Sequence, residues 1–426
     1  MHNSPIGQNS KAVAAPNSTE STSNSRTSCR RCVLGALIGF CAATAALAQG
    51  QPRPITGELQ VNQLVTGDQR APEVAMSDDG THRIVWQSDG QDGSGQAIVS
   101  RRFPGDGSEP FNESVLNQST VGDQSNPGIG MNAGGDWIAV WKTSAAGAKI
   151  RGRASSNNGS TLGNEFAVSQ AATATGLPAA SRAIDDSFVA VWEDPGTFRP
   201  FDAASQPITG DLDLAPALGN LFSPRVASTP VGGFVTVLYA NDSDNFGVFA
   251  RRFDSGGDPV GELIGLSESE ESAQTDPAVD SAADGSFVAA WRDGVLGARV
   301  RCFTAAGVPR GGEIPLDPSN SVPRVAVSPG GAFVVTLAPV LGEVLAFEFD
   351  RTCRPVGTSF QVNTTTNGSQ NSVAAAAGSD RFVIVWQSAN LDGNLLAVAR
   401  RLYRFRSIFA DDFESGDELA WSASVP

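Results

Sequence analysis

The chain is poor in the residues that most often carry out chemistry in proteins. Its 426 residues include two histidines, His2 and His82, and only His82 lies in the body of the chain, on or beside an apolar strand. We expect His82 in the core. A lone histidine excludes a histidine-rich zinc site and disfavours a Ser-His-Asp triad. No nucleophile elbow, phosphate-binding loop or dinucleotide fingerprint occurs in a convincing context. We therefore predict no catalytic residue, and an enzyme is the less favoured class.

Long apolar runs are also scarce. One run, Cys32–Ala46, follows Arg30 and Arg31 and leads into an Ala-Leu-Ala site that ends at Ala48. A basic region, a short apolar core and such a site predict a signal peptide cleaved after Ala48, and the run is too short for a membrane span. We expect a secreted, periplasmic or cell-surface protein. The arginine pair leaves the general secretory and twin-arginine routes both open.

Positive charge is equally limited. Without the leader, which holds Lys11, Arg26, Arg30 and Arg31 against Glu20, the 30 basic and 45 acidic residues fall to 26 and 44, a net charge of −18. No basic patch remains to neutralise phosphates, so we do not expect a nucleic acid partner. Acidity of this kind favours solubility outside the cell.

One apolar strand recurs seven times, and it often reads Phe-Val-x-Val-Trp. The last residues of successive copies lie 46 to 55 residues apart. This period, with strand signals and no helical ones, is typical of a β-propeller or a β-solenoid. The copies are Thr81–Trp86, Trp137–Trp141, Phe188–Trp192, Phe234–Leu238, Phe287–Trp291, Phe333–Leu337 and Phe382–Trp386.

Each repeat also shows a short strand that often begins with proline, a third strand, and a fourth strand after a glycine-rich turn. Four antiparallel strands make one propeller blade. The first recognisable strand, 58–62, matches the fourth strand 359–363, whereas the last strand, 396–403, is a third strand with no fourth after it. We therefore predict an all-β, seven-bladed propeller of four-stranded antiparallel blades, closed by pairing of strand 58–62 with the last blade.

The regular placement of tryptophan in this repeat indicates the core rather than a ligand platform. The leader aside, the two cysteines are Cys302 and Cys353, in successive repeats. A disulfide between neighbouring blades and a pair of buried free thiols both stay open.

A loop with asparagine, glycine and glutamine at constant spacing recurs from Asn62, Asn117 and Asn363. One interpretation is a polar ring around the channel mouth. The favoured one is a hydrogen-bonded crossover that locks adjacent blades, because a loop between blades must satisfy its own backbone groups.

Carboxylates are the only plentiful reactive groups. In a propeller, the loops between second and third strands share one face with the crossovers between blades. Converging acidic oxygens on this rim would suit calcium, which takes six to eight oxygen ligands, although aspartate in loops is more often a turn former. Paired rim carboxylates would also serve as the acid and base of a glycosidase. The speculative calcium ligands are Asp89, Asp92, Asp242, Asp244 and Asp392.

Two parts of the chain resemble known proteins. The units at Pro72–Ala75, Ile84–Trp86 and Arg101–Phe103 resemble the repeats of uncharacterised secreted bacterial seven-bladed propeller proteins, which are adhesin-like exoproteins. That family has no established activity, so the resemblance implies no catalytic residues. The tail, with Phe413–Asp417 before Trp421, resembles a C-terminal segment of many secreted proteobacterial proteins. Sorting or surface retention is one role for it, and an acidic terminus without packing is the other.

The sequence thus predicts a signal peptide (1–48), a propeller (49–405) and an acidic tail (406–426). We interpret the protein as a secreted, monomeric, non-catalytic binding or scaffold propeller for an extracellular glycan or protein. Two alternatives stay open: a carbohydrate-active enzyme, either a glycosidase or a polysaccharide lyase, that uses rim carboxylates, and a calcium-stabilised structural protein of the cell envelope. Asymmetry between the blades would separate them, because an enzyme needs carboxylates that converge in one pocket.

Overall fold

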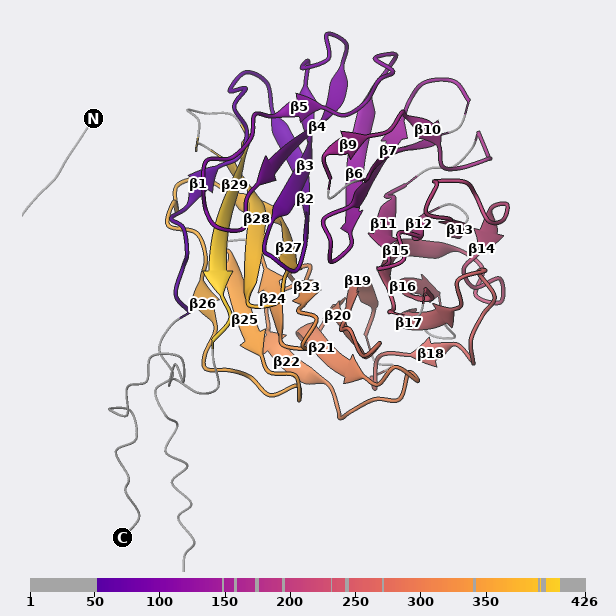
Figure 1. Cartoon of the computed structure of the whole chain (residues 1–426). Helices are drawn as coiled ribbons and strands as arrows, with labels where there is room; N and C mark the ends of the chain where they lie inside the picture. Colours follow the sequence, from indigo (N-terminus) through magenta and orange to yellow (C-terminus); the bar gives the residue numbers. More distant parts are fainter. Residues whose placement is uncertain are drawn as a thin grey trace, which may run out of the picture. The chain divides into compact units, whose positions relative to one another are not determined.

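The protein folds into a ring of seven antiparallel sheets (Figure 1). The computed structural model describes residues 52–406 except 148, 157–158, 173–175, 194–195, 231, 242–244, 270–271, 340–341, 390 and 392–395. The predicted leader and almost all of the predicted tail therefore lie outside the described residues. The regular secondary structure of the described residues consists of β-strands alone, and the predicted seven-bladed propeller is confirmed.

Each blade begins with an inner strand, and the inner strands of neighbouring blades contact one another around a central channel. The inner strands are β2 (Gln69–Met76), β6 (Gln124–Met131), β11 (Ala179–Arg182), β15 (Leu221–Ser228), β19 (Gln274–Ser281), β23 (Arg324–Val327) and β27 (Gln370–Ala377). The second strands are β3 (His82–Asp89), β7 (Trp137–Thr143), β12 (Phe188–Trp192), β16 (Phe234–Asn241), β20 (Phe287–Asp293), β24 (Phe333–Leu337) and β28 (Arg381–Ala389).

Outside these lie the third and fourth strands. The third strands are β4 (Gln96–Phe103), β8 (Ile150–Ser156), β13 (Thr197–Phe201), β17 (Phe246–Phe253), β21 (Gly297–Phe303), β25 (Leu345–Phe349) and β29 (Leu396–Arg404). The fourth strands are β5 (Ser114–Val115), β10 (Phe166–Ala167), β14 (Leu212–Asp213), β18 (Ile264–Gly265), β22 (Ile314–Asp317), β26 (Phe360–Gln361) and β1 (Leu59–Gln60), and the short β9 (Thr161–Leu162) also pairs with β8.

The two ends of the propeller close the ring in the seventh blade. Figure 1 shows the first strand, β1, beside the last, β29. Leu59 pairs with Arg400 and Gln60 with Ala399, and the Val61 amide donates to the Val398 carbonyl at 2.7 Å. The predicted closure through residues 58–62 is confirmed, and it leaves neither edge of the ring open.

Every interface between neighbouring blades has an apolar core of its own. The described residues form seven buried clusters, and each draws on two adjacent blades. This arrangement explains how one ring exceeds the usual size limit of a single core. The prediction that the repeated tryptophans are core residues is confirmed, because Trp86, Trp137, Trp141, Trp192, Trp291 and Trp386 are all buried.

Arginines on the third strands join six of the seven blades to the blade before them. The guanidinium donates to a backbone carbonyl at the end of the preceding blade's fourth strand, at 2.7 to 3.3 Å. Hydrogen bonds to charged groups contribute about 1.5–3 kcal/mol each, which is more than neutral ones do. We call these residues the arginine latches. They are Arg101, Arg153, Arg199, Arg251, Arg301 and Arg401.

The repeated asparagines, which we call crossover locks, tie the start of three crossovers to the blade that each one leaves, in agreement with the favoured interpretation of a hydrogen-bonded crossover. Asn62 accepts from the Val398 amide at 3.0 Å and donates to the Leu64 carbonyl at 2.8 Å. Asn117 and Asn363 make the same pair of contacts in their own blades.

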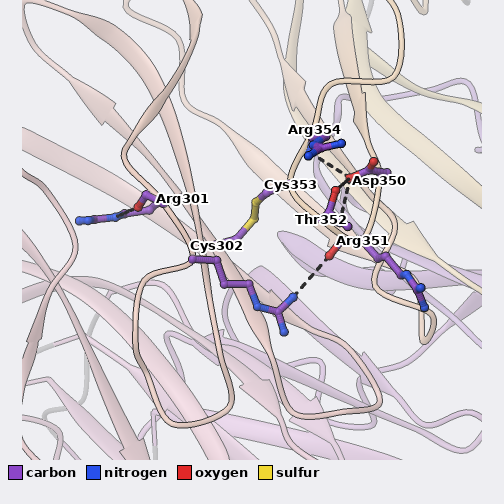
Figure 2. The surroundings of a disulfide bond; sticks show 9 residues. Arg301, Cys302, Asp350, Arg351, Thr352, Cys353 and Arg354 are labelled. Carbon is purple, nitrogen blue, oxygen red and sulfur yellow. Dashed lines mark hydrogen bonds between the residues drawn. A yellow bond between two sulfur atoms is a disulfide. The ribbon is translucent and has the colours of Figure 1, made fainter.

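Phe347 occupies the latch position in the sixth blade, and the chain joins that blade to the fifth covalently. Cys302 on β21 forms a disulfide with Cys353, in the turn after β25, with 6.4 Å between the Cα atoms (Figure 2). Cys353 has a φ of 69°, where the equivalent turns carry glycines such as Gly257 and Gly307. The carboxylate of Asp350 holds this turn by accepting from the amides of Thr352 and Arg354 (Figure 2). The disulfide therefore lies at the one interface whose latch position holds no arginine.

The first prediction concerns this disulfide. We expect C302A/C353G to lower the free energy of unfolding by about 2–4 kcal/mol, because the bond closes a loop of 51 residues. Glycine is chosen at 353 because it suits the positive φ. Chemical denaturation of the oxidised wild type and the variant measures the difference.

If the disulfide takes over the function of a latch, adding F347R to that variant should restore about 1 kcal/mol through a new bond to the fifth blade. A further loss of stability on adding F347R would contradict this interpretation. F347R in the disulfide-bonded protein is the matched control.

Candidate functional site

The inner strands carry a repeated irregularity near their first residues, at the end of the channel where the crossovers arrive. Five of them contain a β-bulge, with register shifts such as those between Arg70 and Glu73 and between Phe222 and Arg225. A residue with positive φ, between 45° and 52°, lies in each bulge. Bulges re-aim side chains and are common beside functional sites. The positive-φ residues are Ala71, Asn126, Ser223, Asp276 and Ser372.

Side chains near the ends of the second strands reach these bulges from the preceding blade. Gln387 accepts from the Ala71 amide at 3.4 Å, Gln87 from the Asn126 amide at 3.3 Å, and Glu193 from the Ser223 amide at 2.6 Å. The residues at this place in the seven blades, which we call the outer ring, differ widely in chemistry. They are Gln87, Lys142, Glu193, Tyr239, Arg292, Ala338 and Gln387.

A second set of equivalent residues, the inner ring, lines the channel just beyond the bulges. The channel has a volume of ≈350 Å³. Four members of the inner ring are glycine or alanine, and the other three are charged. The inner ring consists of Glu73, Gly128, Ala179, Arg225, Ala278, Arg324 and Ala374. Gly128 has no room for a side chain, because a Cβ there would lie 2.8 Å from the Pro178 carbonyl oxygen.

The charged groups of the two rings influence one another. Burial, and then the neighbouring Arg324, lower the pKa of Arg225 to about 10, while Glu73, Glu193 and Asp276 act in the opposite direction. Arg225 therefore stays charged at neutral pH. Its guanidinium donates to the Pro224 carbonyl at 3.1 Å, and that of Arg324 donates to the Pro323 carbonyl at 3.0 Å.

Three half-buried aromatic rings gather at the same end of the fourth blade. Phe222 stacks on Tyr239 with 5.2 Å between centroids, and Phe246 meets both rings edge-on, at 5.8 and 5.4 Å. Burial, followed by the charges of Asp276 and Glu193, raises the pKa of the Tyr239 hydroxyl. Aromatic faces and charged groups therefore adjoin at one part of the channel mouth.

The residues predicted as calcium ligands are not brought together where they are described. Asp89 pairs with Arg70 at 3.4 Å, and Asp92 accepts from the Asn117 side chain at 2.7 Å. Asp242, Asp244 and Asp392 lie outside the described residues. Among the residues that the structure places, no group of three or more His, Cys, Asp or Glu side chains could hold a metal ion. Calcium binding stays a prediction without support from these residues.

His82 is a core residue, as predicted. In five other blades a phenylalanine begins the second strand and stacks on the last aromatic ring of the third; His82 stacks in the same way on Phe103, at 5.3 Å and 8°. Its Nδ1 donates to the Gly80 carbonyl at 2.9 Å, and Arg400 of the seventh blade donates to Nε2 at 3.2 Å. Burial, and then Arg400, lower the pKa of His82 to about 3. The neutral imidazole thus helps to join the first and last blades.

Comparison with known proteins identifies the fold but no family. No family model and no curated protein matches the chain. A protein of unknown function from Dyadobacter fermentans DSM 18053 superposes with a TM-score of 0.53 and 11% identity, over 83% of this chain and 99% of that one. The structure of BBS1N in complex with ARL6DN superposes with a TM-score of 0.47 and 11% identity, over 83% of this chain and 98% of that one. The first likeness shows the fold alone, and the second TM-score is too low to add to it.

Sequence reasoning missed Arg225, Arg324 and Tyr239 as site residues. The signal was present, because Arg225 and Arg324 each follow a proline near the start of an inner strand, where four other blades have glycine or alanine at the equivalent position. Aligning the seven repeats and looking for positions that break the pattern would have found them.

The second prediction concerns pH. Below pH 6.5 the unfolded chain takes up a proton at His82 that the folded protein does not bind until about pH 3, so stability falls as the pH drops through this window. H82F, which copies the other blades, should reduce the slope of unfolding free energy against pH by up to about 1.4 kcal/mol per unit.

Denaturant titrations of the wild type and H82F from pH 7 to pH 3 measure this difference. Asp280, whose pKa burial raises to about 6, has the opposite effect, since its contribution to stability grows as the pH falls from there. Because Asp280 is present in both proteins, it cancels in the difference. Parallel curves for the two proteins would contradict a histidine that is neutral in the folded state.

Proposed function

We propose that this protein is an exported binding propeller whose ligand site is the mouth of the channel at the crossover end. The observation that carries the proposal is the contrast between two sets of equivalent positions. The latches recur in six blades and the crossover locks in three, whereas the outer ring carries six residue types in seven blades and the inner ring places three charged residues among glycine and alanine. Residues that only stabilise a repeat are expected to recur, and a ligand site breaks the symmetry.

A glycan is the ligand class that the mouth supports best. Phe222, Tyr239 and Phe246 offer apolar ring surface, and Glu193 and Arg292 lie next to it as hydrogen-bonding groups for hydroxyls. Aromatic rings beside a few placed polar groups are common in sites that bind small molecules. A protein ligand is the alternative that the experiment below also tests.

Catalysis on that glycan has less support than binding. The carboxylates nearest the aromatic group are already engaged, since Glu193 accepts from the Ser223 amide at 2.6 Å and Asp276 pairs with Arg292 at 2.7 Å. An acid and a base of a glycosidase need a proton to move freely between each carboxyl group and the substrate.

The described part of the chain contains no helix long and apolar enough to cross a membrane.

The third prediction tests the glycan site. Residues 49–426 should bind members of a glycan array, and Y239Q should weaken that binding at least about tenfold, which corresponds to about 1.4 kcal/mol. Glutamine is the residue that two other blades use at this place, so the variant should fold. The control is F111A, which removes an aromatic ring that is 54% exposed and outside the two rings. Equal losses in both variants, or binding to proteins but to no glycan, would overturn the glycan assignment.

The fourth prediction tests export. When the full chain is produced in a bacterium, mass spectrometry should find the mature protein outside the cytoplasm, beginning at Gln49. An unprocessed chain retained in the cytoplasm would refute the proposed leader. Leu47→Arg together with Ala48→Arg is a suitable control, because it destroys the small-residue cleavage site.

A further inference from the structure

Two arginines of the inner ring line the channel without an ion pair to a described residue. Arg225 in the fourth blade and Arg324 in the sixth flank Ala278 of the fifth on the channel wall. Neither makes an ion pair with any residue that the structure describes, and each side chain donates only to the carbonyl of the proline before it. The Nε of Arg324 is buried without a hydrogen-bond partner.

This arrangement is costly in the absence of a ligand. The two like charges repel each other, and the channel removes part of the water that would solvate them. Four blades avoid the cost with glycine or alanine at the same position. Since the fold does not require arginine there, the pair is best explained by a ligand that neutralises it.

The surrounding carboxylates offset the pair only in part. Glu193 and Asp276 have partners of their own, and Glu73, whose charge does act on Arg225, is one negative charge against two positive ones. An oxyanion placed between Arg225 and Arg324 would receive hydrogen bonds from both guanidinium groups, whose planar forks match carboxylate and sulfate oxygens.

We propose that Arg225 and Arg324 together bind an acidic group of the ligand, a carboxylate or a sulfate ester, so that the glycan recognised at the mouth is an acidic one. This inference rests on the proposed function. The channel volume of ≈350 Å³ suits one sugar residue rather than a whole polymer. The charged sugar therefore enters the channel, while its neighbour packs on the aromatic group at the rim.

Isothermal titration calorimetry at constant ionic strength tests the inference with three probes: an oligogalacturonate, a sulfated galactose oligomer and the neutral galactose oligomer. The wild type should bind one or both acidic probes at least about tenfold more tightly than the neutral one. R225A/R324A should bind all three with the affinity of the neutral probe. The two acidic probes distinguish a carboxylate from a sulfate as the preferred group.

The variants copy the alanine of other blades, so they should fold, and relief of the repulsion should leave the melting temperature of the ligand-free double variant equal to or above that of the wild type. R404A, which alters an arginine 63% exposed and outside the inner ring, is the matched control and should keep the preference. A double variant that still prefers acidic probes overturns the inference. Equal binding of acidic and neutral probes by the wild type overturns it while leaving the glycan site intact, and a wild type that binds no glycan overturns the proposed function as well.

Discussion

The contact between one blade and the next is the constraint on which this fold depends. A four-stranded sheet with two apolar faces has no core of its own, and each core exists only where two blades meet. The arginine latches stabilise these inter-blade contacts at their edge. Acidic residues at the fourth strands add further hydrogen bonds between blades; for example, Glu113 accepts from the Gln63 and Leu64 amides at 2.5 and 2.9 Å. Because the ring is closed, opening one interface would expose two apolar faces at once. The interface that lacks a latch, at Phe347, carries the disulfide, which is consistent with a need to keep every interface closed.

Positions fixed by these contacts repeat, and that repetition makes the exceptions informative. Asn62, Asn117 and Asn363 make the same two bonds in three blades, which commits these side chains to the framework. The bulges also repeat, although a positive φ at a residue such as Ala71 costs about 1 kcal/mol or more. Their geometry places the next residues of the inner strands at the channel. The framework is therefore common to the blades, and chemical variety is confined to the two rings at its mouth.

The sequence was sufficient for the architecture because the architecture is a repeat. The spacing of the apolar strands, the match between 58–62 and 359–363, and the regular tryptophans each follow from a period that any blade must keep. The site was not accessible in the same way. Arg225 lines the channel through a bulge whose only sign in the sequence is a small or polar residue before the proline, such as Ser223. Likewise, the sequence suggested that Asp89 lies in a loop with a free carboxylate. In the structure, Arg70 pairs with Asp89, because Arg70 lies just before a bulge and opposite the end of the second strand.

An acidic protein that binds an acidic glycan presents an electrostatic question. The net charge, −15 for the whole chain and −18 without the predicted leader, repels such a ligand at a distance, but at physiological ionic strength this repulsion is screened beyond about 8 Å. Inside the channel the separations are shorter and water is partly excluded, so the attraction of two guanidinium groups is screened much less. The net negative charge therefore gives no attraction that would speed the approach of an anion, and the arginine pair retains only those anions whose oxygens fit between Arg225 and Arg324. Selectivity then comes from slow dissociation rather than fast association, as expected when steering is unfavourable and short-range contacts are strong.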